Sequence, residues 1–63
     1  MTPTTFRVSI AKLGLSQEEA GRWLGLSARQ GQRYATGEAK IPGPVAKLLQ
    51  LMIRFNLRPD DVK

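Results

Sequence analysis

Turn-forming glycines divide this chain into short segments, and their spacing constrains the fold more than any other feature of the sequence. Gly14, Gly25 and Gly37 each follow a stretch with helical character, and glycine just after the last helical residue is a common helix stop. A fourth segment covers residues 43–55, where Pro44 suits the first helical turn. No stretch of four or more residues alternates β-branched or aromatic side chains with polar ones, as a strand requires. The sequence therefore predicts four short helices and no sheet.

Apolar stripes define the first and the last of these helices. Phe6, Ile10 and Leu13 recur at intervals of four and three residues, which predicts a helix over residues 4–13. Residues 43–55 carry a longer stripe with the same spacing. It consists of Val45, Leu48, Leu49, Met52 and Ile53.

Capping residues define the two helices in between. Ser16, followed three residues later by Glu19, has the pattern of a capping box and starts a helix that ends before Gly25. Ser27 then caps a third helix over residues 28–36. Two short helices joined by so tight a turn must cross at a large angle. After the fourth helix the chain continues as a short tail over residues 57–63, with room for one short fifth helical turn.

Composition excludes several classes of function. The 63 residues hold ten Lys/Arg against five Asp/Glu, a net charge of +5 that favours polyanionic partners. The chain has no histidine or cysteine, no acidic pair on one helical face and no phosphate-binding glycine loop. We therefore expect no enzyme, no metal and no cofactor. No apolar stretch approaches the roughly 18 residues of a membrane span and the first residues do not resemble a signal peptide, so we expect a cytoplasmic protein.

Residues 16–36 have the layout of a helix-turn-helix. Gly21 lies four residues before the turn glycine, Gly25, and its small size allows a second helix to pack closely. Leu26 and Tyr34 lie eight residues apart, and we expect both on the buried side of that second helix.

The chain resembles the Cro/C1-type (XRE) family of helix-turn-helix regulators over roughly residues 6–55. The matching motifs are Leu-Ser-Gln at 15–17, Leu-Gly-Leu-Ser at 24–27, Gly-Glu at 37–38 and the segment IPGPVAKLL at 41–49. The resemblance implies an all-α, lambda-repressor-like bundle of four helices that forms one domain over residues 1–63. It also implies a bacterial or phage-encoded transcriptional regulator, a small phage- or plasmid-type repressor whose third helix reads the major groove of double-stranded DNA.

The exposed face of the third helix carries side chains suited to that role. At 100° per residue, one face combines Ala28, Arg29, Gln32, Arg33 and Thr36. Arginine can donate two parallel hydrogen bonds to guanine, and glutamine can form a similar pair with adenine. No acidic residue of this helix lies on the face to repel phosphate. We therefore expect Ala28, Arg29, Gln32 and Arg33 to contact bases.

Phosphate contacts are expected on either side of that face. The resemblance points to Gln17 at the start of the second helix, and helix N-termini make Ser16 and Ser27 suitable neighbours of phosphate. Thr36 and Lys40 lie at the other end of the third helix and in the loop after it. Each residue also has an ordinary reading, because serines cap helices and exposed polar or charged side chains are solvated.

Two residues depart from the family pattern at positions where packing is expected. Ala20 stands where the family usually has a large aliphatic residue, and Gly31 where it usually has valine or isoleucine. Glycine inside a helix costs about 0.5–1 kcal/mol relative to alanine. It would also leave a gap, which we expect Trp23, Tyr34 or Phe6 to fill.

An apolar patch is expected on the fourth helix and the tail. Leu51 and Phe55 lie four residues apart and point away from the buried stripe, with Leu57 or Val62 close behind them. Family members usually bind palindromic operators as dimers, so we expect a homodimer through Leu51, Phe55 and Leu57. Two alternatives remain open. The patch could fold back onto the monomer, or it could bind another protein, as in an antitoxin or adaptor.

Overall fold

A computed structural model describes residues 1–62, which form four α-helices and one 3-10 helix and contain no strand. The elements are α1 (Pro3–Lys12), α2 (Gln17–Trp23), α3 (Ala28–Thr36), α4 (Gly43–Arg54) and the 3-10 helix η1 (Pro59–Asp61). The predicted all-α fold is confirmed, and the expected fifth turn is present as η1. Lys63, the last residue of the expected tail, lies outside the described residues.

The helices end where the turn residues predicted. Gly14, Gly25 and Gly37 all have the left-handed backbone conformation, with φ between 76° and 84°, and Asn56 adopts it after α4 with φ of 56°. At Gly14, Gly25 and Asn56 the residue's own N–H donates to the carbonyl three residues earlier. The next N–H donates to the carbonyl five residues earlier. This pair of bonds is the Schellman motif, which satisfies carbonyls that the end of a helix leaves unpaired.

Side-chain caps begin the first three helices. The Ser16 hydroxyl accepts from the N–H of Glu19 at 3.1 Å, and the Glu19 carboxylate accepts from the N–H of Ser16 at 3.0 Å. The predicted capping box is therefore confirmed. The Ser27 hydroxyl accepts from the N–H of Gln30 at 3.1 Å, and Thr2 caps α1 in the same way.

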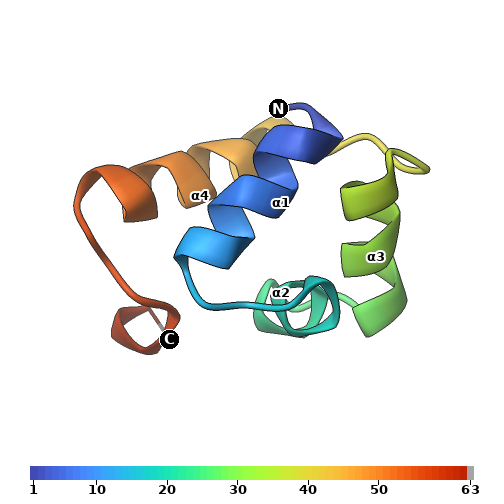
Figure 1. The fold of residues 1–63 in the computed structure, drawn as a ribbon. Coiled ribbons are helices and arrows are strands. Elements are labelled where there is room, and N and C mark those ends of the chain that lie inside the picture. The colour runs from blue at the N-terminus through green and yellow to red at the C-terminus, as the bar shows by residue number, and fades with distance from the viewer. Residues whose placement is uncertain (63) are drawn as a thin grey trace.

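The core lies where α1 meets the other three helices (Figure 1). Phe6, Leu49 and Met52 are its largest fully buried side chains. The Phe6 ring packs edge-on against Tyr34, with 5.7 Å between the ring centroids, a favourable geometry for an aromatic pair. Tyr34 is buried as expected. The expected burial of Leu26 was wrong. Leu26 lies just after the Schellman turn of α2, and 42% of its surface is exposed.

Helices α2 and α3 cross in direct backbone contact. A Cβ atom on Gly31 would lie 2.1 Å from the carbonyl oxygen of Gln17, and one on Gly21 would lie 2.2 Å from that of Ser27. Any side chain at either position would collide with backbone. The expected gap at Gly31 therefore does not exist, because α2 itself occupies the space.

The aromatic residues expected to fill that gap have other contacts. Phe6 and Tyr34 pack against each other. The indole N–H of Trp23 donates to the carbonyl of Pro59 at 3.2 Å. That bond anchors η1 near the end of α2, so the tail folds back along the molecule.

Candidate nucleic-acid interface

The outward face of α3 forms the floor of a shallow depression. All four residues expected to contact bases line it, together with four other polar side chains. The lining residues are Gln17, Glu18, Ala28, Arg29, Gln32, Arg33, Thr36 and Glu38. Arg29 and Gln32 are exposed, and Arg33 is partly exposed. The structure thus brings two guanidinium groups, from Arg29 and Arg33, and two carboxamides, from Gln17 and Gln32, to a single surface.

Three sets of contacts hold α3 in place beneath this surface. Its N-terminus is capped by Ser27, and its middle lies against α2 at Gly31. Its C-terminal end is bound by Arg7 of α1, whose guanidinium donates one hydrogen bond to the carbonyl of Ala35 and another, at 3.0 Å, to the hydroxyl of Thr4. A positive charge at a helix C-terminus also interacts favourably with the helix dipole.

Arg7 is a positioning residue that sequence reasoning missed. Its place on the first helix suggested only longer-range attraction to phosphate. The partner carbonyl lies 28 residues away along the chain, so no local pattern could have identified the contact.

The residues expected to contact phosphate are divided between different places. Gln17 and Thr36 line the depression at α3. Ser16 and Ser27 do not line it, and each hydroxyl accepts a capping hydrogen bond while keeping its own proton to donate. Lys40 lines a separate hollow beside the start of α1. Only Gln17 and Thr36 therefore share a surface with the residues expected to contact bases.

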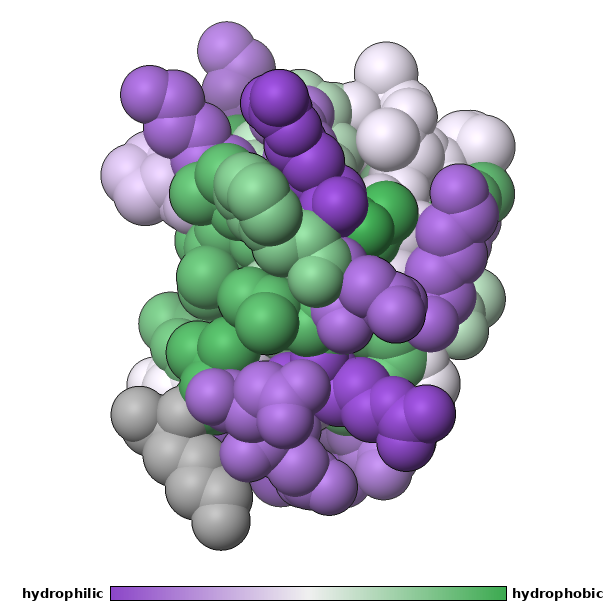
Figure 2. Space-filling model, turned by 90° about the vertical axis from the view of Figure 1, so that its left-hand side faces the viewer, coloured by the Kyte–Doolittle hydropathy of each residue, from purple (hydrophilic) through white to green (hydrophobic). Residues whose placement is uncertain are grey.

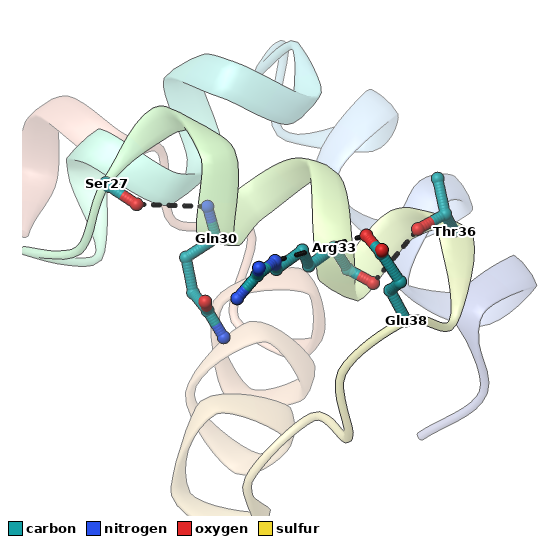
Figure 3. A network of polar contacts seen from close by, with 5 residues as sticks. All are labelled: Ser27, Gln30, Arg33, Thr36 and Glu38. Carbon is teal, nitrogen blue, oxygen red and sulfur yellow. Dashed lines mark hydrogen bonds and ion pairs between the residues drawn. The ribbon is translucent and has the colours of Figure 1, made fainter.

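Two acidic side chains border the same depression, although α3 itself carries none on this face. Glu18 reaches it from α2 and Glu38 from the loop after α3. The Oε2 atom of Glu38 lies 4.0 Å from Nε of Arg33 (Figure 3). Sequence reasoning treated Glu38 only as part of a family motif. Glu38 comes five residues after Arg33, just beyond the glycine that ends the helix. That short separation was the signal that could have revealed the pair.

The apolar residues expected at a dimer interface are exposed. Leu51 has 49% of its surface exposed and Phe55 has 63%, so Phe55 does not pack onto the monomer core. Leu57 is also exposed, and the guanidinium carbon of Arg54 lies 5.7 Å from the Phe55 ring centroid. Figure 2 looks onto the side where α4 ends and shows hydrophobic side chains gathered there with hydrophilic ones around them. Val62 instead lines a hollow beside Trp23.

No group of three or more acidic, histidine or cysteine side chains within residues 1–62 could hold a metal ion. None of the helices in that range is long and apolar enough to cross a membrane. The sequence matches no protein-family model, no curated protein and no solved structure.

Proposed function

We propose that this chain is a sequence-specific double-stranded DNA-binding protein that regulates transcription. In this proposal the helices form a lambda-repressor-like bundle, α2 and α3 act as a helix-turn-helix, and α3 lies in the major groove. One observation carries the proposal: the buried side of α3 is held by backbone contact with α2, while its outward side carries Arg29, Gln32 and Arg33. A rigid helix with exposed forked donors is what base reading requires.

The roles of the side chains follow from their chemistry. Arg29 and Arg33 each present a planar fork that can bond guanine O6 and N7, and Gln32 can pair with adenine N6 and N7. Ala28 is small enough to let the base edges approach and can contact a thymine methyl group. The polar residues on either side of the outward face of α3 contact phosphates and fix the orientation of that helix on the DNA. They are Ser16, Gln17, Ser27, Thr36 and Lys40.

The proposed partner is a palindromic operator bound by two copies of the chain. A single α3 of nine residues reaches only a few base pairs, and a second copy on the symmetric half-site doubles the contacts. The exposed residues Leu51, Phe55 and Leu57 form the proposed homodimer surface. The chain then acts as a small repressor of phage or plasmid type in the bacterial cytoplasm.

Selection of bound sequences from a random DNA pool tests this proposal most directly. We expect enrichment of an inverted repeat whose half-sites contain guanine and adenine at the positions facing α3. Binding should also weaken by orders of magnitude between about 50 and 200 mM salt if several phosphates are neutralised. Uniform affinity for all sequences, or no binding at low salt, would contradict the proposal.

Truncation of either arginine of α3 should relax specificity at one base pair. We expect Arg29→Ala or Arg33→Ala to weaken the binding free energy for the selected operator by about 1–3 kcal/mol. Each variant should also lose its preference for the base that the arginine contacts. Lys47→Ala removes the same charge from the exposed surface of α4 and serves as the control, with preference retained at every position. Competition titrations against single-base operator variants measure both effects. Equal losses on all sequences would exclude base reading by that arginine.

A protein-interaction module is the second candidate function. The observation that favours it is the exposure of Leu51 on α4 and of Phe55 directly after it, since exposed apolar patches often mark binding surfaces. In this case the chain acts as an antitoxin or adaptor, and α4 binds the partner. A purified stoichiometric partner, together with no retardation of any DNA sequence, would favour this function over the first.

A further inference from the structure

The pair formed by Arg33 and Glu38 lies within the surface proposed to read DNA. Nε of Arg33 and Oε2 of Glu38 are 4.0 Å apart, and the two side chains have 43% and 71% of their surfaces exposed. Figure 3 shows Glu38 reaching back from the loop toward the guanidinium of Arg33. An exposed pair of this length is weak, so a stronger partner can replace the carboxylate.

The backbone after α3 keeps Glu38 close to Arg33. Gly37 turns the chain with a φ of 84°, a conformation that glycine adopts without strain. The N–H of Ala39 then donates to the carbonyl of Arg33 at 3.3 Å, and the hydroxyl of Thr36 donates to the same oxygen at 3.3 Å. The loop is therefore fastened to the helical turn that carries Arg33. The backbone position of Glu38 is therefore a consequence of that turn.

The carboxylate approaches a particular edge of the guanidinium. At 4.0 Å the approach of Oε2 to Nε is longer than a hydrogen bond, and the two terminal nitrogens, Nη1 and Nη2, stay available to other acceptors. A guanine offers O6 and N7 as a matching pair, whereas a single phosphate oxygen competes with Glu38 for one charge. The pair thus offsets the attraction of Arg33 to phosphate while leaving a forked donor for a base.

We propose that Glu38 is a specificity-determining residue, which orients Arg33 for guanine and lowers its contribution to non-specific DNA binding. This inference rests on the proposed DNA-binding function. It means that Glu38, a residue outside α3, contributes to the selection of a base. Its consequence is measurable as the ratio of operator affinity to non-specific affinity, not as affinity alone.

The chain offers a matched control in Glu18. Glu18 borders the same depression, and the one ion pair seen among the described residues, Arg33–Glu38, does not include it. Glu18→Gln and Glu38→Gln therefore remove the same charge from the same surface, but only the second releases Arg33. A third variant, Glu38→Asp, keeps the charge and shortens the reach by one methylene group.

Affinities of the four proteins for the selected operator and for a scrambled duplex, at one salt concentration, test the inference. We expect Glu38→Gln to bind the scrambled duplex more tightly and to lose about threefold in specificity ratio, the size of effect that a weak exposed ion pair supports. Glu18→Gln should strengthen binding to both duplexes equally and keep the ratio. Glu38→Asp should lose specificity without gaining non-specific affinity. In an Arg33→Ala background, Glu38→Gln should leave the ratio unchanged.

The outcomes separate this inference from the proposed function. Equal ratios for wild type, Glu18→Gln and Glu38→Gln, with a clear operator preference in all three, would overturn the role of Glu38 and leave DNA reading intact. Absence of any operator preference in the wild type would overturn both. The pair can also be measured in the free protein, where the Arg33 Nε–H resonance should shift in Glu38→Gln and not in Glu18→Gln. An unshifted resonance in Glu38→Gln would likewise overturn the inference.

Discussion

Ser16 and Glu19 bind each other reciprocally at the start of α2. The backbone N–H of Ser16 donates to the Glu19 carboxylate, and the N–H of Glu19 donates to the Ser16 hydroxyl. The first of these bonds lowers the pKa of Glu19 most. The Ser16 side chain and the charge of Arg22 lower it further, while slight burial opposes them. Because the charged form of Glu19 holds the cap, α2 is anchored more strongly when Glu19 is ionised.

The cap should therefore depend on pH in one direction. The folded-state pKa of Glu19 lies below its unfolded value, so its stabilising contribution is complete above the unfolded pKa and is lost as pH falls through the folded pKa. We expect the stability difference between wild type and Glu19→Gln to shrink between neutral pH and about pH 3. Urea denaturation at both pH values measures it. Glu18→Gln removes a charge from the same turn without touching the cap, and an equal narrowing in that variant would contradict the assignment.

At the scale of elements, the crossing of α2 and α3 depends on two glycines. The backbones of the two glycines are in contact: a Cβ atom added to Gly31 would lie only 2.8 Å from the N atom of Gly21. The entropic cost of a glycine inside α3 is offset by close packing that no other residue permits. The crossing also determines which face of α3 remains in solvent, and therefore where Arg29 and Gln32 point.

Alanine at this crossing should have the opposite effect to alanine in an ordinary helix. Gly→Ala commonly stabilises an exposed helix interior by about 0.5–1 kcal/mol. We expect Gly31→Ala to destabilise the protein by about 2 kcal/mol or more, because its Cβ would collide with the carbonyl oxygen of Gln17 and force the helices apart. Gln32→Ala is the control, since it places alanine at an exposed position of the same helix, and it should be neutral or slightly stabilising. Urea midpoints compare the two, and equal midpoints would show that the crossing tolerates a side chain.

In the molecule as a whole, the outward face of α3 and the apolar patch at the end of α4 lie apart. Figure 1 places α3 on one side and the end of α4 on the other, across a molecule 28 Å in its longest dimension. Two copies joined through Leu51 and Phe55 would leave both α3 faces exposed. Half-sites on DNA lie about 34 Å apart, one helical turn, or at a multiple of that spacing. Joining two such faces raises affinity through effective concentration.

A charge placed in the patch should separate the two copies. We expect Phe55→Glu to sediment as a monomer and to bind the selected operator at least tenfold more weakly, since a buried unpaired carboxylate at the interface would be strongly unfavourable. Val8→Glu places the same charge on an exposed apolar residue of α1 and should leave the sedimentation unchanged. Analytical ultracentrifugation with and without operator measures both. A wild-type chain that remains monomeric on its operator would refute the dimer.

The helices and their ends could be predicted because they depend on neighbouring residues. Gly14, Gly25 and Gly37 adopt the left-handed conformation expected of a helix stop, and Ser16 and Ser27 cap the helices that follow. These interactions span three to five residues, so the local sequence contains all the participants. The same helical periodicity correctly grouped the residues on the outward face of α3.

The contacts between helices were decided by the tertiary structure alone. Arg7 binds the end of α3 across 28 residues, and Trp23 binds the tail across 36. The direct contact of Gly21 with Gly31 reversed the expectation of a gap, because the space beside a glycine depends on how closely its neighbours approach. Local sequence patterns were enough to establish which segments are helical and which face of α3 is polar. Only the packing of all four helices decided what holds α3, because contacts between distant segments follow no sequence period.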